Sequence, residues 1–338
     1  MNGGELQMKT DNDILMEVRN LRKWFPVSGG LGKEKKFVKA VDDVNLIIKK
    51  GETLGIVGES GCGKSTFARL ILRLIEATEG QVIFKGRDLM KLSEEEMRRT
   101  RLHMQMVFQD PYASLNPRMR VGSILSEPFV IHRLCSEKEA KKKAAELLEL
   151  VGLGSDSLKK YPHEFSGGQR QRICIARALA VSPDMLVCDE CVSALDVSIQ
   201  AQIINLLVKL QKELGIALVF ISHDLRIVQH ISTQVAVMYL GEVVETAPKE
   251  ELFKRPTHPY TKALLSAVPV PRPGVEKNRI VLHGELPSPI NRPKGCSFCT
   301  RCSMADESCR LAPPPRMLVG DGHYCRCTKV GGTVNQIV

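Results

Sequence analysis

The segment GESGCGKST, from Gly58 to Thr66, constrains the fold more than any other stretch of this chain. It follows a short apolar run, Leu54 to Val57, and leads into a longer apolar segment, so it lies between a predicted buried strand and a predicted helix. It matches the pattern G-x-x-x-x-G-K-[ST], in which glycines let backbone N–H groups surround phosphate groups. The positive end of the following helix adds to the attraction. We therefore predict an α/β fold that binds a nucleotide.

Each polar residue of this phosphate loop has a predicted role. Lys64 is expected to reach the β and γ phosphates, and Ser65 to bind Mg²⁺. The helix N-terminus is expected to lower the pKa of the Cys62 thiol and so make it sensitive to oxidation or alkylation. The other nucleotide-binding residues predicted in the loop are Gly58, Ser60, Gly61, Gly63 and Thr66.

A second candidate site segment is the apolar run MLVCDE, which ends in Asp189 and Glu190. A buried strand delivers both carboxylates to the edge of the sheet beside the phosphate loop. We predict that Asp189 holds Mg²⁺ and that Glu190 is the general base that polarises the attacking water.

The order of the predicted elements gives the architecture. Residues 16–50 alternate apolar and polar residues in short runs typical of antiparallel strands, and GQVIFKGRDL reads as a hairpin. Ser136 and Glu139 form a capping box at the start of an amphipathic helix. Farther on, strands alternate with helices, which predicts a mainly parallel sheet covered on both faces.

Three segments are predicted from the composition: a polar N-terminal tail (1–15), a nucleotide-binding domain (16–267) and a C-terminal extension (268–338). The extension contains VPVPRPG, LPSPINRP and APPPR. Because proline interrupts both helices and sheets, we interpret the extension as an extended appendage.

Charge and hydropathy bear on the surroundings of the protein. The net charge of +10 suits an anionic ligand such as a nucleotide, or a position beside an anionic membrane leaflet. The first residues contain no apolar secretion signal, and no run approaches 18 apolar residues. We therefore expect a cytoplasmic protein, whose eleven cysteines are reduced thiols or metal ligands.

The segment FSGGQRQR, residues 165–172, resembles the signature motif of ATP-binding-cassette (ABC) ATPases. Other motifs of that family follow its order: Gln109 matches the Q-loop, SALD (193–196) the D-loop, and His223 the switch histidine. The resemblance covers roughly residues 16–266. It implies a P-loop NTPase fold with an antiparallel β subdomain and a helical subdomain at about residues 110–175.

The resemblance also implies further site residues. Gln109 would contribute to the Mg²⁺ site and, with Glu190 and His223, to catalysis. Phe25 would stack on adenine, with Trp24 as the second candidate. The γ-phosphate bound by one subunit would be contacted by the signature and D-loop of the other, which here are Ser166, Gly167, Gly168, Gln169 and Asp196.

One residue departs from the family pattern. Cys191 follows Glu190, where the family usually has proline or alanine. Cysteine neither fixes φ nor removes a backbone donor as proline does. Since Glu190 is present, we expect hydrolysis to survive the change.

The long segment QDPYASLNPRMRVGSILSEP resembles the ATPase subunits of dipeptide and oligopeptide importers, as does HPYTKALLSAVP. The partners implied are a second, related but non-identical ATPase subunit, two integral membrane permeases and an extracytoplasmic peptide-binding protein. The chain would then be peripheral on the cytoplasmic face of the inner membrane. The expected permease-docking surface includes Tyr112, Leu115, Pro117 and Met119.

The sequence leaves the cargo and the class of cassette open at this point. Nickel or another small solute is the second candidate cargo after peptide. A soluble cassette that acts on nucleic acid or ribosomes carries the same nucleotide-binding motifs, whereas a transporter implies no nucleic acid partner. A regulatory module without hydrolysis is a third class, which the presence of Lys64, Asp189, Glu190 and His223 disfavours.

Six of the eleven cysteines lie in the last 43 residues. Peptide-importer ATPases end in a comparable pattern, and the resemblance maps four ligands onto Cys296, Cys302, Cys309 and Cys327, with Cys299 and Cys325 in reserve. Four thiolates could bind a 4Fe–4S cluster or a tetrahedral zinc ion, and thiols without metal are the third possibility.

Overall fold

The computed structural model describes residues 13–27, 36–268, 279–285 and 287–334. A four-stranded antiparallel sheet contains the residues for which antiparallel strands and a hairpin were predicted, and both predictions are confirmed. Its strands, in spatial order, are β2 (Lys36–Lys49), β1 (Ile14–Val27), β4 (Glu79–Phe84) and β5 (Arg87–Asp88).

A nine-stranded sheet forms the centre of the molecule, and its five core strands run parallel. Every residue of β3, β7 and β8 is buried, as expected for strands covered on both faces. The predicted parallel core is confirmed. The spatial order is β13 (Thr333–Val334), β11 (Met317–Gly320), β12 (His323–Cys325), β10 (Glu242–Pro248), β9 (Gln234–Tyr239), β3 (Thr53–Val57), β8 (Ala217–Ile221), β7 (Met185–Asp189) and β6 (Met104–Val107).

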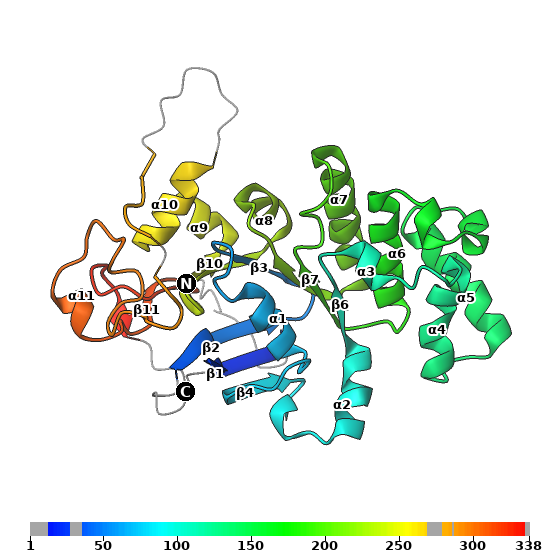
Figure 1. Ribbon diagram of the computed structural model, residues 1–338, viewed down its shortest axis with the longest axis horizontal. Coiled ribbons are helices and arrows are strands. Elements are labelled where there is room, and N and C mark those ends of the chain that lie inside the picture. The colour runs from blue at the N-terminus through cyan, green and yellow to red at the C-terminus, as the bar shows by residue number, and fades with distance from the viewer. Residues whose placement is uncertain (1–12, 28–35, 269–278, 286, 335–338) are drawn as a thin grey trace, which may run out of the picture.

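Helices cover both faces of this sheet, and α4 to α6 gather at the end opposite the C-terminal strands (Figure 1). Among the described residues, no helix combines the length and apolar character needed to cross a membrane. The α-helices are α1 (Lys64–Ile71), α2 (Glu94–Thr100), α3 (Pro111–Ser114), α4 (Val121–Ile131), α5 (Glu137–Leu150), α6 (Gly167–Leu179), α7 (Val197–Leu214), α8 (Leu225–Ile231), α9 (Lys249–Lys254), α10 (Pro259–Ala267) and α11 (Ser308–Leu311). Single 3₁₀ turns are η2 (Leu89–Lys91), η3 (Arg101–His103), η4 (Ser155–Lys159) and η5 (Pro162–Glu164).

Helix α5 begins where the capping box predicted. The Ser136 N–H donates to Glu139 Oε2 at 3.0 Å, and the Glu139 N–H donates to Ser136 Oγ at 3.4 Å. The two hydrogen bonds satisfy backbone N–H groups that have no partner within the helix. Such a cap stabilises a helix by about 1 kcal/mol. On its predicted apolar stripe, Ala140, Ala144 and Leu148 are buried, whereas Leu147 is partly buried.

The apolar core lies on the two faces of the parallel sheet. Side chains alternate along each strand, so Leu186 and Cys188 of β7 belong to one buried cluster, whereas Met185 and Val187 belong to the other. The first cluster continues into the helical end of the molecule, and the second fills the space between β3, α1 and the antiparallel sheet. The sheet therefore lies between the two clusters and packs against the helical end of the molecule on one face and the antiparallel sheet on the other.

The interpretation of the C-terminal extension as an appendage without sheet structure is wrong. Strand β12 pairs with β10 through Glu245 and Cys325, and β11 and β13 extend the sheet beyond it. The three strands are only two to four residues long and lie outside the proline clusters, so proline does not prevent their pairing. Residues 269–278 of the extension and 1–12 of the predicted N-terminal tail lie outside the described residues.

A buried acid anchors the extension to the main sheet. His323 Nε2 of β12 lies 2.7 Å from Glu245 Oε1 of β10, and both side chains are buried. The same carboxylate accepts the N–H groups of Thr257 at 2.7 Å and His258 at 3.0 Å. Although burial alone would raise the pKa of Glu245, these hydrogen bonds, that of His323 first, lower it below its usual range. The carboxylate thus holds three segments together in its charged form.

Candidate functional site

The phosphate loop joins β3 to α1 and takes a shape that only glycine allows. Gly63, which precedes α1, has a φ of 103°, and a Cβ atom there would overlap the carbonyl oxygen of Ala40. The loop and its neighbours surround a cavity of about 310 Å³. Its lining includes the predicted residues Ser60, Gly61, Gly63, Lys64, Ser65 and Thr66, together with Val38, Lys39, Ala40, Gln109, Glu190, Leu240, Gly241 and Pro289.

Lys64 places a buried positive charge at the base of this loop. Its Nζ donates to the carbonyl oxygens of Gly58 at 2.9 Å and Glu59 at 3.0 Å. Only 4% of the residue is exposed. Because these acceptors are neutral, the ammonium keeps its net charge, which favours an anion bound in the loop.

Ser65 and Asp189 form a pair of oxygen ligands beside the cavity. Ser65 Oγ donates to Asp189 Oδ1 at 2.9 Å. Burial raises the pKa of Asp189, the Ser65 hydrogen bond opposes this, and the charge of Glu190 raises it further. Hydroxyl and carboxylate oxygens are the ligands that Mg²⁺ takes, so these residues fit the ion predicted for them.

Glu190 is flanked by the two other predicted catalytic residues. Gln109 Nε2 donates to Glu190 Oε2 at 3.1 Å, and His223 Nδ1 lies 3.8 Å from Glu190 Oε1. Glu190 has a φ of 47°, a left-handed conformation that is uncommon outside glycine and that occurs at functional sites. In this structure Gln109 bonds Glu190 and Ser193, not the Ser65–Asp189 pair.

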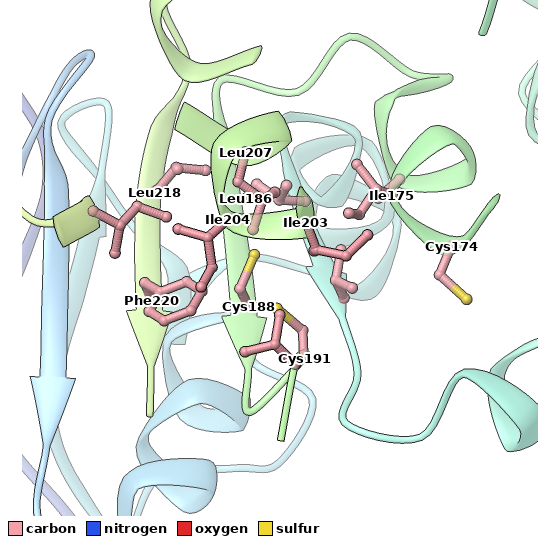
Figure 2. Close-up of a cluster of buried hydrophobic side chains, with 14 of the residues drawn as sticks. Cys174, Ile175, Leu186, Cys188, Cys191, Ile203, Ile204, Leu207, Leu218 and Phe220 are labelled. Carbon is pink, nitrogen blue, oxygen red and sulfur yellow. The ribbon is translucent and has the colours of Figure 1, made fainter. Parts of the chain in front are cut away.

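The two cysteines near these residues are core side chains. Cys191 and Cys188 lie side by side among apolar residues such as Ile203 and Phe220 (Figure 2). The small side chain of Cys191 fits this buried position after Glu190. The expectation for Cys62 is wrong, because the thiol is buried and burial raises its pKa, outweighing the nearby Lys64 charge.

The signature residues face a different cavity, of about 660 Å³. Ser166 caps α6 in a capping box with Gln169. A Cβ atom on Gly168 would overlap Ile199 of α7, so the close contact of these helices requires glycine. Gln109 lines this cavity as well as the phosphate-loop cavity, while the remaining lining is Asp110, Pro111, Tyr112, Ser166, Gly167, Gly168, Ala194, Leu195, Asp196 and Ile199.

Phe25 and Trp24 lie on adjacent positions of β1 and therefore on opposite faces. Phe25 is 39% exposed and pairs with Val38, which lines the phosphate-loop cavity. Trp24 Nε1 instead donates to Asp42 at 3.1 Å, and Lys39 Nζ lies over its ring. Of the two aromatic residues, Phe25 is the one whose ring is available to stack on adenine, although it does not line the cavity itself.

The tail cysteines gather in one region. The Cys296 N–H donates to the Cys309 carbonyl at 2.8 Å. Burial, with smaller contributions from the charges of Cys299, Cys327 and Cys309, raises the pKa of Cys296 to about 12. Burial also raises the pKa of Cys302, to which Cys327 and Cys309 contribute. Within the described part of the chain, however, no three His, Cys, Asp or Glu side chains are arranged to hold a metal ion.

Two site residues could not be predicted from the sequence. Pro289 of the tail lines the phosphate-loop cavity, and its carbonyl accepts the Lys39 N–H at 3.3 Å. Tyr260 Oη accepts the backbone N–H of Glu59, inside the phosphate loop, at 3.0 Å. Tyr260 lies in the segment HPYTKALLSAVP, which resembles the importer ATPases. Because it is far from the phosphate loop in sequence, that resemblance does not predict the contact.

Comparison with known proteins assigns the family. A family model described as ABC transporter matches residues 41–193, and one described as the C-terminal region of oligopeptide/dipeptide transporters matches residues 244–309. The chain is 54% identical over 321 residues to the oligopeptide transport ATP-binding protein AppF of Bacillus subtilis, covering 94% of this chain and 98% of that protein. The chain belongs to the ATP-binding subunits of oligopeptide and dipeptide ABC importers.

Further relatives of this importer subunit agree. The oligopeptide transport ATP-binding protein OppF of Escherichia coli is 50% identical over 324 residues, covering 94% of this chain and 96% of that protein. The ATP-binding cassette MJ0796, solved as a dimer in a post-hydrolysis state with ADP and phosphate, is 31% identical with a TM-score of 0.61. It matches 70% of this chain over 99% of its own length. The predicted ABC fold and ATPase activity are thereby confirmed.

The position of Glu190 predicts its effect on turnover. The substitution Glu190→Gln removes the general base but keeps the size of the side chain and its ability to form hydrogen bonds. ATP turnover by the assembled importer should therefore fall by about 100-fold or more. The exposed Glu146→Gln on α5 removes the same charge and should leave turnover unchanged. Equal turnover in the Glu190→Gln and unmodified importers would show that another group is the base.

Proposed function

We propose that this importer subunit hydrolyses ATP in a site that it completes only together with a second cassette. The observation that carries this is the separation of the two predicted half-sites. The phosphate-binding residues line one cavity, whereas Ser166 and Asp196 line another. A nucleotide held by Lys64 would therefore meet the signature residues of a partner cassette. The partner is a related, non-identical ATPase subunit.

Within each shared site, the residues of this chain divide the chemistry. Lys64 and the loop N–H groups would bind the phosphates, and Ser65 and Asp189 would hold a Mg²⁺ ion, whose charge would offset that of the phosphates. Glu190 accepts a proton from the attacking water, while Gln109 and His223 orient the water and the γ-phosphate. Phe25 would stack on the adenine base of the nucleotide. Gly58 and Cys62 contribute to the shape of the phosphate loop. The N-terminus of α6, with Gly167, Gly168 and Gln169, would contact the γ-phosphate held by the partner.

This arrangement couples nucleotide state to assembly. Two cassettes that share ATP across their interface are held together by its γ-phosphate, and hydrolysis removes that contact. Opening and closing of the pair would then drive movement of peptide through two membrane permeases, which receive it from an extracytoplasmic binding protein. The chain would work as a peripheral subunit on the cytoplasmic face of the inner membrane.

The permeases have a candidate docking groove beside Gln109. A cavity of about 370 Å³ between α1, β6 and α4 is lined by apolar side chains that include Leu74, Phe108 and Ile131. These three side chains are 39% to 53% exposed. The occupant we propose is a short helix from a permease, since the family receives its membrane subunits near the Q-loop. None of the four residues predicted for the docking surface lines this cavity: Leu115 is buried in the core, and Tyr112 lines the cavity that the signature residues face.

A charge in this groove should release the permeases. Recovery of permease subunits from detergent-solubilised membranes by tagged Ile131→Glu should fall by about tenfold or more, because apolar interface anchors are worth about 2 kcal/mol or more. Leu311→Glu, an exposed change in the tail, should recover them as the unmodified chain does. If the unmodified chain recovers no integral membrane protein, the transport proposal is wrong. Equal recovery by both variants would place the docking surface elsewhere.

We propose also that the tail thiols bind a 4Fe–4S cluster through Cys296, Cys302, Cys309 and Cys327. The donor set fits, because soft thiolates are the ligands of such clusters. A tetrahedral zinc ion held by the same thiolates is the second candidate, and no preformed metal-binding group among the described residues favours either one.

Metal analysis tests this proposal. Anaerobically purified protein should contain iron and sulfide and absorb visible light through thiolate-to-iron charge transfer, and Cys302→Ser should lose the iron. Cys135→Ser, which changes a cysteine at the helical end of the molecule, should keep it. Colourless protein with one zinc per chain would establish a zinc site instead. Protein without any metal would contradict the proposal and show that the cysteines are structural thiols.

A further inference from the structure

Glu59 is the residue of the phosphate loop that the extension contacts directly. Three groups fix it: Tyr260 Oη accepts its backbone N–H at 3.0 Å, and Lys64 Nζ donates to its carbonyl oxygen at 3.0 Å. Arg301 Nη1 donates to both carboxylate oxygens, at 3.0 and 3.1 Å. The backbone and the side chain of one loop residue are thus held by groups from three parts of the sequence.

Arg301 is itself held in place. Its side chain is only 11% exposed, and its guanidinium lies 6.0 Å from the ring centroid of Tyr239. Phe298, three residues earlier, packs against Tyr239 and Tyr260 with ring centroids 5.2 and 5.4 Å apart. A guanidinium with little freedom loses little entropy when it binds a carboxylate, so the ion pair with Glu59 is stronger than an exposed one.

The extension also reaches the other end of the nucleotide cavity. Arg292, with 8% of its side chain exposed, lies 3.3 Å from Asp42 and 3.6 Å from Glu242, and it also donates to the carbonyl of Lys39. Pro289 lines the cavity beside that segment. Within residues 289–301, Pro289 therefore lines the nucleotide cavity beside β2, whereas Arg301 contacts the phosphate loop at Glu59.

We propose that Arg301 is a positioning residue for nucleotide binding, which holds Glu59 and thereby keeps the phosphate loop in its binding shape. The cysteine-rich extension is then part of the nucleotide site and not only a structural addition. This inference rests on the proposed function, because it assigns a further residue to the same ATP site. Arg301 does not line the cavity, so it acts through Glu59 and Lys64.

The role predicts a specific kinetic pattern. A loop that has lost its support binds substrate and transition state about equally less well, so KM rises while kcat stays the same. In the assembled importer, Arg301→Gln should raise the KM for MgATP by about tenfold, as expected for loss of a charge-assisted contact. The binding constant of MgADP for the full chain should weaken by a similar factor. Arg301→Lys, which keeps the charge, should recover part of the loss.

Two comparisons separate positioning from mere stabilisation of the tail. Arg279→Gln removes the same charge from an exposed site of the extension and should leave the KM unchanged. Glu59→Gln should weaken MgADP binding as Arg301→Gln does, and the double variant should be no worse than either single one, because all three lose the same pair. Binding of MgADP should in turn slow amide hydrogen exchange at residues 298–302, since coupling between two sites is reciprocal.

Other results would overturn the inference. If Arg301→Gln lowers only the fraction of folded protein, kcat falls and the KM stays constant, and Arg301 is structural. Additive losses in the double variant would show that the two side chains act independently. If the unmodified importer does not hydrolyse ATP, the proposed function fails as well, and the two failures are thereby distinguishable.

Discussion

The buried ammonium of Lys64 is the interaction on which the site depends. Its bonds to the carbonyls of Gly58 and Glu59 hold the loop closed around a positive charge, at a place where burial would otherwise be costly. The loop keeps this shape because β3, buried on both faces, fixes one end and α1 fixes the other. A bound phosphate would neutralise the charge of the Lys64 ammonium, so the same residue both shapes the loop and binds the anion.

The sequence predicted the parts of this molecule that follow local rules. Strand alternation, the capping box of α5 and the phosphate-loop pattern depend on residues close together in the chain, and all three are found as predicted. The errors concern tertiary burial. Cys62 was expected to be reactive because it precedes a helix, but Gly58, Lys64 and the core enclose its thiol. Proline content likewise could not reveal that the short segments around Cys325 pair with β10.

The extension distinguishes this chain from a minimal cassette. MJ0796 matches 70% of the chain over nearly its whole length, so the remaining share has no counterpart there. In this importer subunit the extension is joined to the sheet by the buried Glu245–His323 pair and to the phosphate loop by Arg301. Long-range contacts of this kind leave no periodic pattern, which explains why Pro289 and Arg301 could not be assigned to the ATP site from sequence.

We propose that one chain carries two half-sites and completes neither alone. The most direct measurement is a structure of the intact importer carrying Glu190→Gln, determined by electron cryomicroscopy with bound MgATP. We expect the γ-phosphate held by Lys64 to contact the signature helix of the partner cassette, while Ser166 contacts the nucleotide held by that partner. A nucleotide bound by Lys64 and Ser166 of the same chain would contradict it.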